Sequence, residues 1–483
     1  MRFTTRASAV SIIPVLFVAA LAALVASAAR AAGPASSGDS SVESRNDAGV
    51  ARTIHVGGPV VDDGNPFYQE LGSNGRRCVT CHDPKTNMTI TPAAVRARFL
   101  STGGTDPIFR TNDGANSPEA DVSTPLARLA AYSMLLTKGV IRVGMGIPPG
   151  AEFELVRVDD PYRFASSTEL SLFRRPLPST NLTFLSTVMW DGRETDQRGN
   201  AAAIHFDLSK QANDATTGHA QSPNDVAPAQ RGAIVNYELG LFTAQLVDRR
   251  AGNLAADGAA GGPDVLATEP FEFGGNDPLG CDANGANCTG KNPNFDPVVF
   301  TEFEGWQGAR GSARDEARAA IARGETLFNT LPIRITNVAG INDDFNVRVV
   351  RGTCSTCHDT PHAGDHSVPA PLDIGVADPP VRGSLRNRFG LVVGDMPVYT
   401  LRNKTTRRTK VTTDPGRALI TGKWSDIGRF KGPILRGLSG RAPYFHNGAA
   451  ATLAEVVNFY DNRFELKLSD RQKADLVAFL RAL

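Results

Sequence analysis

The sequence predicts a mainly α-helical protein of two related domains, with long loop insertions and a small β element. Three observations support this prediction. The pentapeptide Cys-x-x-Cys-His occurs twice, at residues 78–82 and 354–358. Apolar residues recur at three- and four-residue steps in several stretches, which is the spacing of amphipathic helices. The stretches between them are rich in Gly, Asn, Asp and Pro, as loops are.

Length and charge limit the classes of protein that fit. The chain has 483 residues, 41% of them hydrophobic, which suffices for two or three domains with real cores. Its 51 Lys and Arg residues nearly balance its 50 Asp and Glu residues. The overall charge therefore gives no indication of binding to nucleic acid or to an anionic membrane.

The two pentapeptides have the spacing of c-type haem attachment. Two thiols three positions apart can add to the two vinyl groups of one haem, and the following histidine is then held at the iron. A redox Cys-x-x-Cys pair or half of a zinc site is the alternative, but a tetrahedral zinc site needs a second pair, so the two motifs would have to meet in space. We therefore expect two covalently bound haem c groups, each in a cytochrome c-like domain. The cofactor-binding residues are Cys78, Cys81, His82, Cys354, Cys357 and His358, with the two histidines as iron ligands.

The N-terminus has the pattern of an export signal. Two arginines precede an apolar, alanine-rich run at 7–29, which ends in the small-residue pattern Ala29-Arg30-Ala31. An uncleaved membrane anchor is the alternative, but Pro14 interrupts the run. Bacterial haem attachment takes place outside the cytoplasmic membrane, so the signal and the haem motifs support each other. We expect a periplasmic or secreted protein with no stable membrane insertion after cleavage.

Two cysteines remain outside the pentapeptides. Cys281 and Cys288 stand seven residues apart in a polar loop. In an oxidising compartment we expect them to form a small disulfide that clips this loop.

Composition divides the chain into five segments. Residues 32–54 contain few large apolar side chains, and 251–310 is rich in Gly, Asn and Asp. The expected organisation is a signal peptide at 1–31, a disordered linker at 32–54, an N-terminal haem domain at 55–250, a surface insertion at 251–310 and a C-terminal haem domain at 311–483.

Local patterns predict the individual elements. The alternation of apolar and polar residues at 153–158 predicts a strand. Amphipathic spacing and capping signals predict helices at 67–71, 91–100, 123–136, 205–215 and 233–247, another from Ser312, and a last helix capped by Ser469 and Gln472.

The motifs together resemble those of the bacterial dihaem cytochrome c peroxidases. They are equally similar to those of MauG, the dihaem enzyme that matures a tryptophan-derived quinone. The set consists of the two haem motifs, the sequence Trp-Asp-Gly-Arg at 190–193 between them, and the run 416–461, which contains GR, LR and APYFH in the family's order. The resemblance covers both haem domains and excludes the long insertions.

The resemblance implies roles for further residues. Trp190 would lie between the haems and mediate electron transfer. Tyr460 would be the sixth ligand of the second haem, with Met396 as the rival ligand because a thioether is the usual partner of a high-potential haem. The backbone carbonyls of Arg441 and Pro443 would hold a calcium ion.

The sequence departs from the peroxidases around the first haem. No histidine occurs between His82 and His205, so the sixth position of the first iron is expected to be open. The separation of His82 and Trp190 is similar to that in the dihaem rubber oxygenases. Asn200 and Lys210 stand where the peroxidases carry a glutamine and the catalytic glutamate. The distal acid and base are therefore unassigned.

One histidine is a candidate for the unassigned distal role. His205 could move a peroxide proton if it lies in the first haem pocket, and the alternative is a hydrogen-bonded surface histidine. His219 stands in a polar run and is expected to be a loop residue.

These observations predict an exported oxidoreductase of the cytochrome c peroxidase type. The second haem accepts electrons from a small redox protein and passes them through Trp190 to the first haem, which reduces hydrogen peroxide. One alternative is an oxidase or dioxygenase, similar to MauG or to the rubber oxygenases, that uses dioxygen or peroxide with an organic or protein substrate. Another is a dihaem electron carrier without catalytic activity. Homodimerisation is a further candidate interaction.

Overall fold

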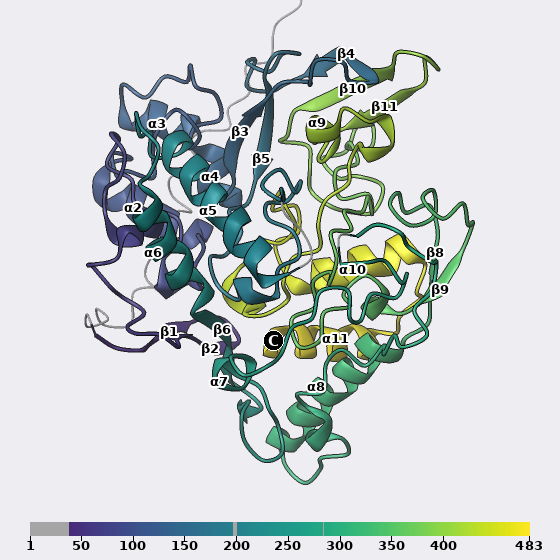
Figure 1. Cartoon of the computed structure of the whole chain (residues 1–483). Helices are drawn as coiled ribbons and strands as arrows, with labels where there is room; N and C mark the ends of the chain where they lie inside the picture. The colour runs from purple at the N-terminus through teal and green to yellow at the C-terminus, as the bar shows by residue number, and fades with distance from the viewer. Residues whose placement is uncertain (1–37, 197–199, 284) are drawn as a thin grey trace, which may run out of the picture. The chain divides into compact units, whose positions relative to one another are not determined.

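A computed structural model describes residues 38–196, 200–283 and 285–483 (Figure 1). These residues cluster as one unit, so the two expected haem domains are not separate bodies. The expected signal peptide and the first residues of the expected linker lie outside the described part of the chain.

The expected disordered linker at 32–54 is wrong for its described part, which forms two strands. β1 (Ser41–Arg45) and β2 (Gly49–His55) pair with each other, and β2 also pairs with β6 (Leu241–Asp248). A short strand, β7 (Gly252–Asn253), completes this antiparallel sheet in the order β1-β2-β6-β7. The small side chains of this segment suit a closely packed sheet, whose partner strand comes from a distant part of the sequence.

Three further sheets are smaller. The predicted strand at 153–158 is confirmed as part of β4, which pairs with a strand from the other half of the chain. Strands account for 15% of the described residues and helices for 29%, so the expected mainly α-helical fold is confirmed only in part. The sheets consist of β4 (Phe153–Asp159) with β10 (Val398–Asn403) and β11 (Thr409–Thr412), β3 (Ile141–Met145) with β5 (Leu170–Arg174), and β8 (Ile333–Ile335) with β9 (Val350–Gly352).

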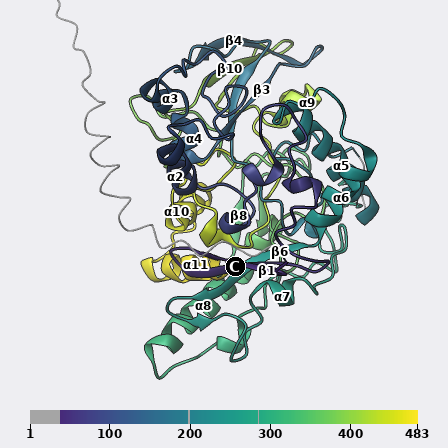
Figure 2. The ribbon, with the colours of Figure 1, turned by 90° about the vertical axis from the view of Figure 1, so that its left-hand side faces the viewer.

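Among the described residues the two longest helices are α5 and α8, with 18 residues each, and one lies in each half of the chain (Figures 1 and 2). The predicted helices at 91–100, at 205–215 and from Ser312 are confirmed as α2, α5 and α8. The predicted capping box is present at α11. The helices are α2 (Pro92–Thr102), α3 (Pro125–Ala131), α4 (Ser133–Lys138), α5 (Ala201–Gly218), α6 (Pro228–Leu239), α7 (Pro263–Leu266), α8 (Ala313–Thr330), α9 (Ala418–Thr421), α10 (Leu453–Phe464) and α11 (Asp470–Ala482).

Three predicted helices differ from the structure. The one at 123–136 is divided at Tyr132 into α3 and α4. The one at 67–71 is reduced to a single 3-10 turn, η2 (Pro66–Tyr68). The one at 233–247 ends with α6, and the chain continues as β6. A continuous apolar run fits a buried strand as well as a helix, and the pairing of β6 with β2 decides between them.

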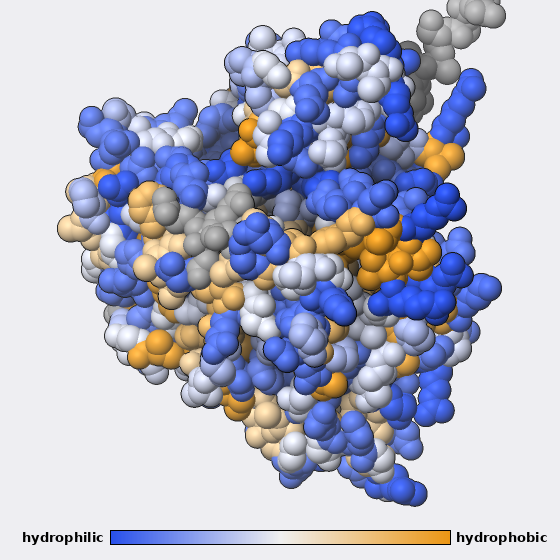
Figure 3. Space-filling model, turned by 45° about the vertical axis from the view of Figure 1, so that its right-hand side comes forward, coloured by the Kyte–Doolittle hydropathy of each residue, from blue (hydrophilic) through white to orange (hydrophobic). Residues whose placement is uncertain are grey.

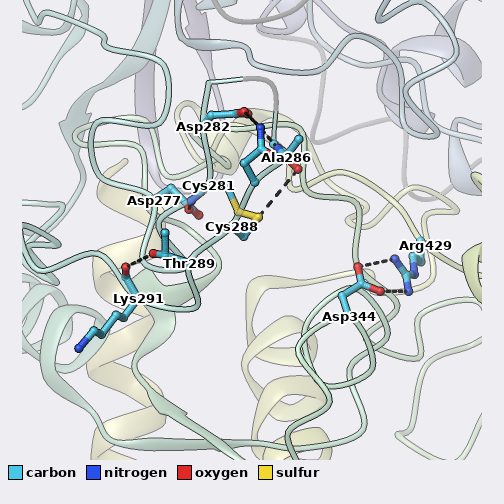
Figure 4. Close-up of a disulfide and its surroundings, with 11 residues drawn as sticks. Asp277, Cys281, Asp282, Ala286, Cys288, Thr289, Lys291, Asp344 and Arg429 are labelled. Carbon is cyan, nitrogen blue, oxygen red and sulfur yellow. Dashed lines mark hydrogen bonds and ion pairs between the residues drawn. A yellow bond between two sulfur atoms is a disulfide. The ribbon is translucent and has the colours of Figure 1, made fainter.

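Only the middle part of the insertion at 251–310 lies on the surface. Near its ends, Leu254, Phe300, Phe303 and Trp306 are buried in the core formed with α8, α10 and α11, so the expected surface excursion is wrong there. The expected disulfide between Cys281 and Cys288 is confirmed, in the loop shown in Figure 4.

Contacts between the two halves explain why no domain boundary separates them. β4 from the first half pairs with β10 from the second. The N–H group of Gln245 in β6, in the first half, donates to the carbonyl oxygen of Leu483, which follows α11, at 3.2 Å. The halves therefore share sheets and hydrogen bonds as well as side-chain packing.

The surface is mixed in character. On the face shown in Figure 3, hydrophilic residues predominate and hydrophobic ones gather near the middle. Within the described ranges, no helix has both the length and the apolar character needed to cross a membrane.

Candidate haem-binding cavities

The two Cys-x-x-Cys-His motifs adopt the same local conformation. Each begins with a 3-10 turn, η3 (Cys78–Thr80) or η7 (Cys354–Thr356). In each turn the threonine hydroxyl accepts a hydrogen bond from the backbone N–H of the residue before the first cysteine. The distance is 2.9 Å for both Thr80 and Thr356. The histidine N–H then donates to the carbonyl of that first cysteine, at 3.0 and 3.1 Å. The threonine shared by the two motifs thus closes the turn that presents both thiols.

The two histidines are held in the same way. Nδ1 of His82 donates to the carbonyl of Met88 at 3.2 Å, and Nδ1 of His358 donates to that of Gly364 at 2.6 Å. This bond fixes the tautomer and leaves Nε2 unprotonated, as an iron ligand requires. Burial lowers the pKa of His82 to about 4 and also lowers that of His358, so both imidazoles are neutral.

Each motif lies in the wall of its own cavity. The first cavity, of about 250 Å³, contains Cys78, Cys81 and His82, and the second, of about 210 Å³, contains the other motif. All four of these cysteines are free thiols. The motifs do not meet, and no cluster of three or more His, Cys, Asp or Glu residues suited to a metal ion occurs in the part of the chain that the structure describes. The zinc alternative therefore has no support.

Polar atoms in the cavity walls have the character needed to bind haem. Arg441 lines the first cavity, and its Nε and Nη2 are buried without a hydrogen-bond partner among the described residues. A haem propionate would satisfy such a guanidinium. Nε2 of His446, in the wall of the second cavity, is likewise buried without a hydrogen-bond partner among the described residues, with Oδ2 of Asp414 at 3.9 Å. The free thiols, the oriented imidazoles and these buried polar atoms fit haem groups.

Trp190 lies in the wall shared by the two cavities. Its indole Nε1 donates to the carbonyl of Arg175 at 2.8 Å, and its own carbonyl accepts from the N–H of Lys431 at 2.9 Å. Its ring centroid lies 6.2 Å from that of His446. The residues that line both cavities are Trp190, Lys431, Pro433, Leu438, Tyr444 and Phe445.

A buried ionic network anchors the turn that carries this tryptophan. Asp191 is 0% exposed and forms ion pairs with Arg174 and Arg193. Arg174 also forms a bidentate pair with Asp414, with distances of 2.7 and 2.9 Å. Burial alone would raise the pKa of Asp191, but the two guanidinium groups lower it to about 2. The carboxylate is therefore charged, and it holds the Trp-Asp-Gly-Arg turn against the second half of the chain.

The two candidate sixth ligands of the second haem lie in different places. Tyr460, on α10, lines the second cavity, and its ring centroid is 6.5 Å from that of His358. Met396 is 4% exposed and packs in an apolar cluster outside the lining of either cavity. The geometry therefore favours Tyr460. Burial raises the pKa of this phenol, which stays neutral unless a cation binds its oxygen.

One of the two expected calcium ligands accepts a hydrogen bond from a guanidinium group. The carbonyl of Arg441, one of the two expected ligands, accepts from Nη2 of Arg175 at 3.0 Å. The same guanidinium also donates to the carbonyls of Ile90, Lys138 and Gly139, at 2.8, 3.3 and 3.0 Å. Burial lowers the pKa of Arg175 to about 10, which leaves it charged at neutral pH. An internal cation thus already binds the carbonyl of Arg441, and a calcium ion held by the carbonyls of Arg441 and Pro443 stays a prediction.

The distal candidates inferred from sequence do not reach the first cavity. Nε2 of His205 lies 3.1 Å from Oδ1 of Asn236, and His205 is outside the cavity lining. Lys210 is also outside, with ion pairs to Glu194 and Asp196 at 2.7 and 3.3 Å. The alternative reading of His205, a hydrogen-bonded histidine near the surface, is the one that the geometry supports.

Two titratable groups in this cavity were missed from sequence. His219 is the C-cap residue of α5, not a residue of an open loop, and it lines the cavity. Glu238 is 5% exposed, and one of its carboxylate oxygens has no hydrogen-bond partner within the described ranges. Burial raises the pKa of Glu238 to about 7, and a hydrogen bond with Ser179 opposes this shift only in part. Neither residue belongs to a recognisable motif, so only the fold reveals them.

Comparison with known proteins supports a family relationship over part of the chain. No protein-family model matches it. Over 150 residues the chain is 32% identical to cytochrome-c peroxidase IdrP1 of Pseudomonas sp. (strain SCT), a match that covers 27% of this chain and 36% of the relative. Over 151 residues it is 33% identical to cytochrome-c peroxidase IdrP2 of Denitromonas iodatirespirans, with coverage of 29% and 38%. The chain thus spans little more than a third of the length of these curated relatives.

A solved structure gives a weaker similarity. The crystal structure of a MauG-like protein associated with microbial copper homeostasis superposes with a TM-score of 0.31 at 17% identity, covering 66% of this chain and 76% of that one. This score is too low to establish a common fold. The sequence matches, together with the motifs, show that about 150 residues of this chain are related to cytochrome-c peroxidases, as expected.

Proposed function

We propose that this protein is an exported dihaem c-type oxidoreductase that reduces hydrogen peroxide with electrons from a small redox protein. The first cavity takes peroxide, and the second is the electron entry site. The names of the related proteins support this reaction, although each match covers only part of the relative. The observation that carries the proposal is the position of Trp190 in the wall of both cavities.

The chain's own residues have defined tasks in this proposal. The bound haem iron supplies the redox chemistry. The four thiols would hold each haem by two thioether bonds, and Nε2 of His82 or His358 would ligate its iron. Arg441 would neutralise a propionate in the first cavity. The indole of Trp190 fills the wall between the cavities and excludes water from the path of the electrons.

The experiment is peroxide turnover by the purified holoprotein with reduced cytochrome c as donor. The proposal predicts that two equivalents of the cytochrome are oxidised for each peroxide consumed, at a rate proportional to the amount of holoprotein. Peroxide that leaves the donor reduced, at any protein concentration, overturns the proposal.

A second candidate function is a MauG-like or rubber-oxygenase-like oxidase that acts on an organic or protein substrate. The presence of Tyr460 in the second cavity and the exclusion of Met396 favour it, because the resemblance links a tyrosine ligand to MauG. Oxygen uptake in the presence of an oxidisable organic substrate distinguishes the two. Uptake without oxidation of the cytochrome supports this candidate over the first.

A further inference from the structure

His219 lies at the first cavity together with His82, although the two residues are far apart in sequence. α5 ends at Gly218 and brings His219 against the segment just before the haem motif. The carbonyl of His219 accepts from Nδ2 of Asn74 at 2.8 Å and from Nη1 of Arg76 at 3.1 Å. The backbone of the histidine is thereby tied to the segment that carries the first haem.

The imidazole is oriented by a buried carboxylate. Nδ1 of His219 donates to Oδ2 of Asp113 at 2.6 Å. The other oxygen of Asp113 forms an ion pair with Nη1 of Arg76 at 2.5 Å. The side chains of Asp113 and Arg76 are 7% and 5% exposed. All three residues line the cavity, and among the described residues no hydrogen bond or ion pair engages Nε2 of His219, whose side chain is 38% exposed.

The neighbours of Asp113 determine the ionisation state of its carboxylate. Burial alone would raise the pKa of Asp113, but the hydrogen bond from His219 and the charge of Arg76 hold it below the usual value. A carboxylate on Nδ1 fixes the tautomer in which Nε2 is a proton acceptor, and it stabilises the imidazolium that forms when Nε2 takes up a proton.

We propose that His219, positioned by Asp113 and Arg76, is the proton-transferring residue of the first cavity. This inference rests on the proposed peroxide reduction. Nε2 takes the proton from the peroxide oxygen that binds and delivers it to the other oxygen as the O–O bond breaks. With two electrons from the redox protein and two protons from solvent, one hydrogen peroxide gives two water molecules. The group that moves the proton is thus a histidine from α5, in place of the glutamate that the resemblance implies.

The test uses cyanide binding to the ferric holoprotein, followed by stopped-flow absorbance. Hydrogen cyanide, like hydrogen peroxide, must lose a proton to a base in the cavity as it binds. General acid–base groups contribute about 10² to 10⁴ in rate, so His219→Gln should slow cyanide association at the first haem by about 10²-fold. Asp113→Asn should slow it by a smaller factor, because Nε2 remains but the tautomer is no longer fixed. Asp225→Asn, which changes an exposed carboxylate that contacts only Asn213, is the matched control and should leave the rate unchanged.

The outcomes separate this proposal from its rivals. An unchanged cyanide rate in His219→Gln overturns it, and a large loss in Glu238→Gln alone would assign the proton transfer to that residue instead. A change of the resting first haem from low spin to high spin in His219→Gln would make His219 an iron ligand and also overturn it. If His219→Gln slows cyanide binding but the wild-type protein does not turn over peroxide, the proposed peroxide reduction is overturned. His219 then remains assigned as the proton-transferring residue of the first cavity.

Discussion

The indole Nε1 of Trp190 donates to the backbone carbonyl of Arg175 at 2.8 Å, and this bond fixes the ring in the wall shared by the two cavities. An aromatic ring held in one orientation between two haems can mediate electron transfer. It shortens the part of the path that contains neither a haem nor an aromatic group. Trp190→Phe keeps a ring but loses the hydrogen bond, and Trp190→Ala loses both. We expect both variants to retain covalent haem and to slow electron transfer between the haems, with the larger effect in Trp190→Ala.

Stopped-flow oxidation of the reduced protein by peroxide measures this transfer. Trp424→Phe is the control, because that tryptophan packs in a separate apolar cluster outside both cavity linings. If the interhaem rates of the Trp190 variants equal that of the wild type, Trp190 is a packing residue only.

The ligand of the second haem is tested by a pair of substitutions. Tyr460 lines the second cavity and Met396 does not, so only a change at Tyr460 should alter the second iron. Tyr460→His should change the ferric spectrum and raise the potential of the second haem, since it replaces an anionic oxygen that favours the ferric state. Met396→Leu should change neither. Redox titration followed by absorbance measures both variants, and a shift in Met396→Leu alone would assign the ligand to Met396.

The hydrogen bonds of Arg175 predict that the stability of the protein does not depend on calcium. Its guanidinium binds four backbone carbonyls, including that of Arg441, which the sequence suggested as a calcium ligand. Chelation should leave the thermal midpoint unchanged. Arg175→Met should lower the free energy of unfolding by at least about 3 kcal/mol, because several buried carbonyls lose their donors.

Thermal unfolding of the holoprotein with and without a chelator tests both parts. Arg157→Met, at an exposed site on β4, is the matched control and should have little effect. A loss of stability on chelation, restored by calcium, would show that the expected metal site exists after all.

Acid stability depends on Asp191. Its pKa in the folded protein is about 2, below the usual value of 3.8, so its contribution to stability is present above pH 4 and is lost as the pH falls toward 2. A depression of this size corresponds to about 2 kcal/mol. Asp191→Asn should be less stable at neutral pH and should show a shallower loss of stability between pH 4 and 2. Denaturant unfolding at a series of pH values measures the slope, and equal slopes for the two proteins would contradict the assignment.

The candidate haem-binding residues could be recognised from sequence because each Cys-x-x-Cys-His motif occupies five consecutive positions. The same holds for the disulfide, whose cysteines are seven residues apart, and for the α11 capping box. In each case the interacting groups are close in the chain. Trp190 could be proposed only through a resemblance, since a single tryptophan beside a turn is equally typical of an ordinary core.

The remaining features depend on contacts between distant segments. β1 and β2 lie in a segment with few large apolar side chains, which did not predict strands, and β2 pairs with the distant strand β6. His219 and Asp113 are 106 residues apart, and neither lies in a motif. His205 has a suitable chemical group, but the direction in which α5 presents it could not be read from sequence. The role of Arg175 likewise becomes apparent only in the folded structure, where backbone carbonyls from three other segments surround its guanidinium group.

The central claim is that the two cavities carry two connected haems that reduce peroxide. The most direct measurement is the addition of one equivalent of hydrogen peroxide to the fully reduced, anaerobic holoprotein, followed by absorbance and electron paramagnetic resonance. Two connected haems supply two electrons, so a single equivalent should oxidise both of them to the ferric state with the release of water. Oxidation of only one haem by an equivalent of peroxide, or of neither, would contradict the account.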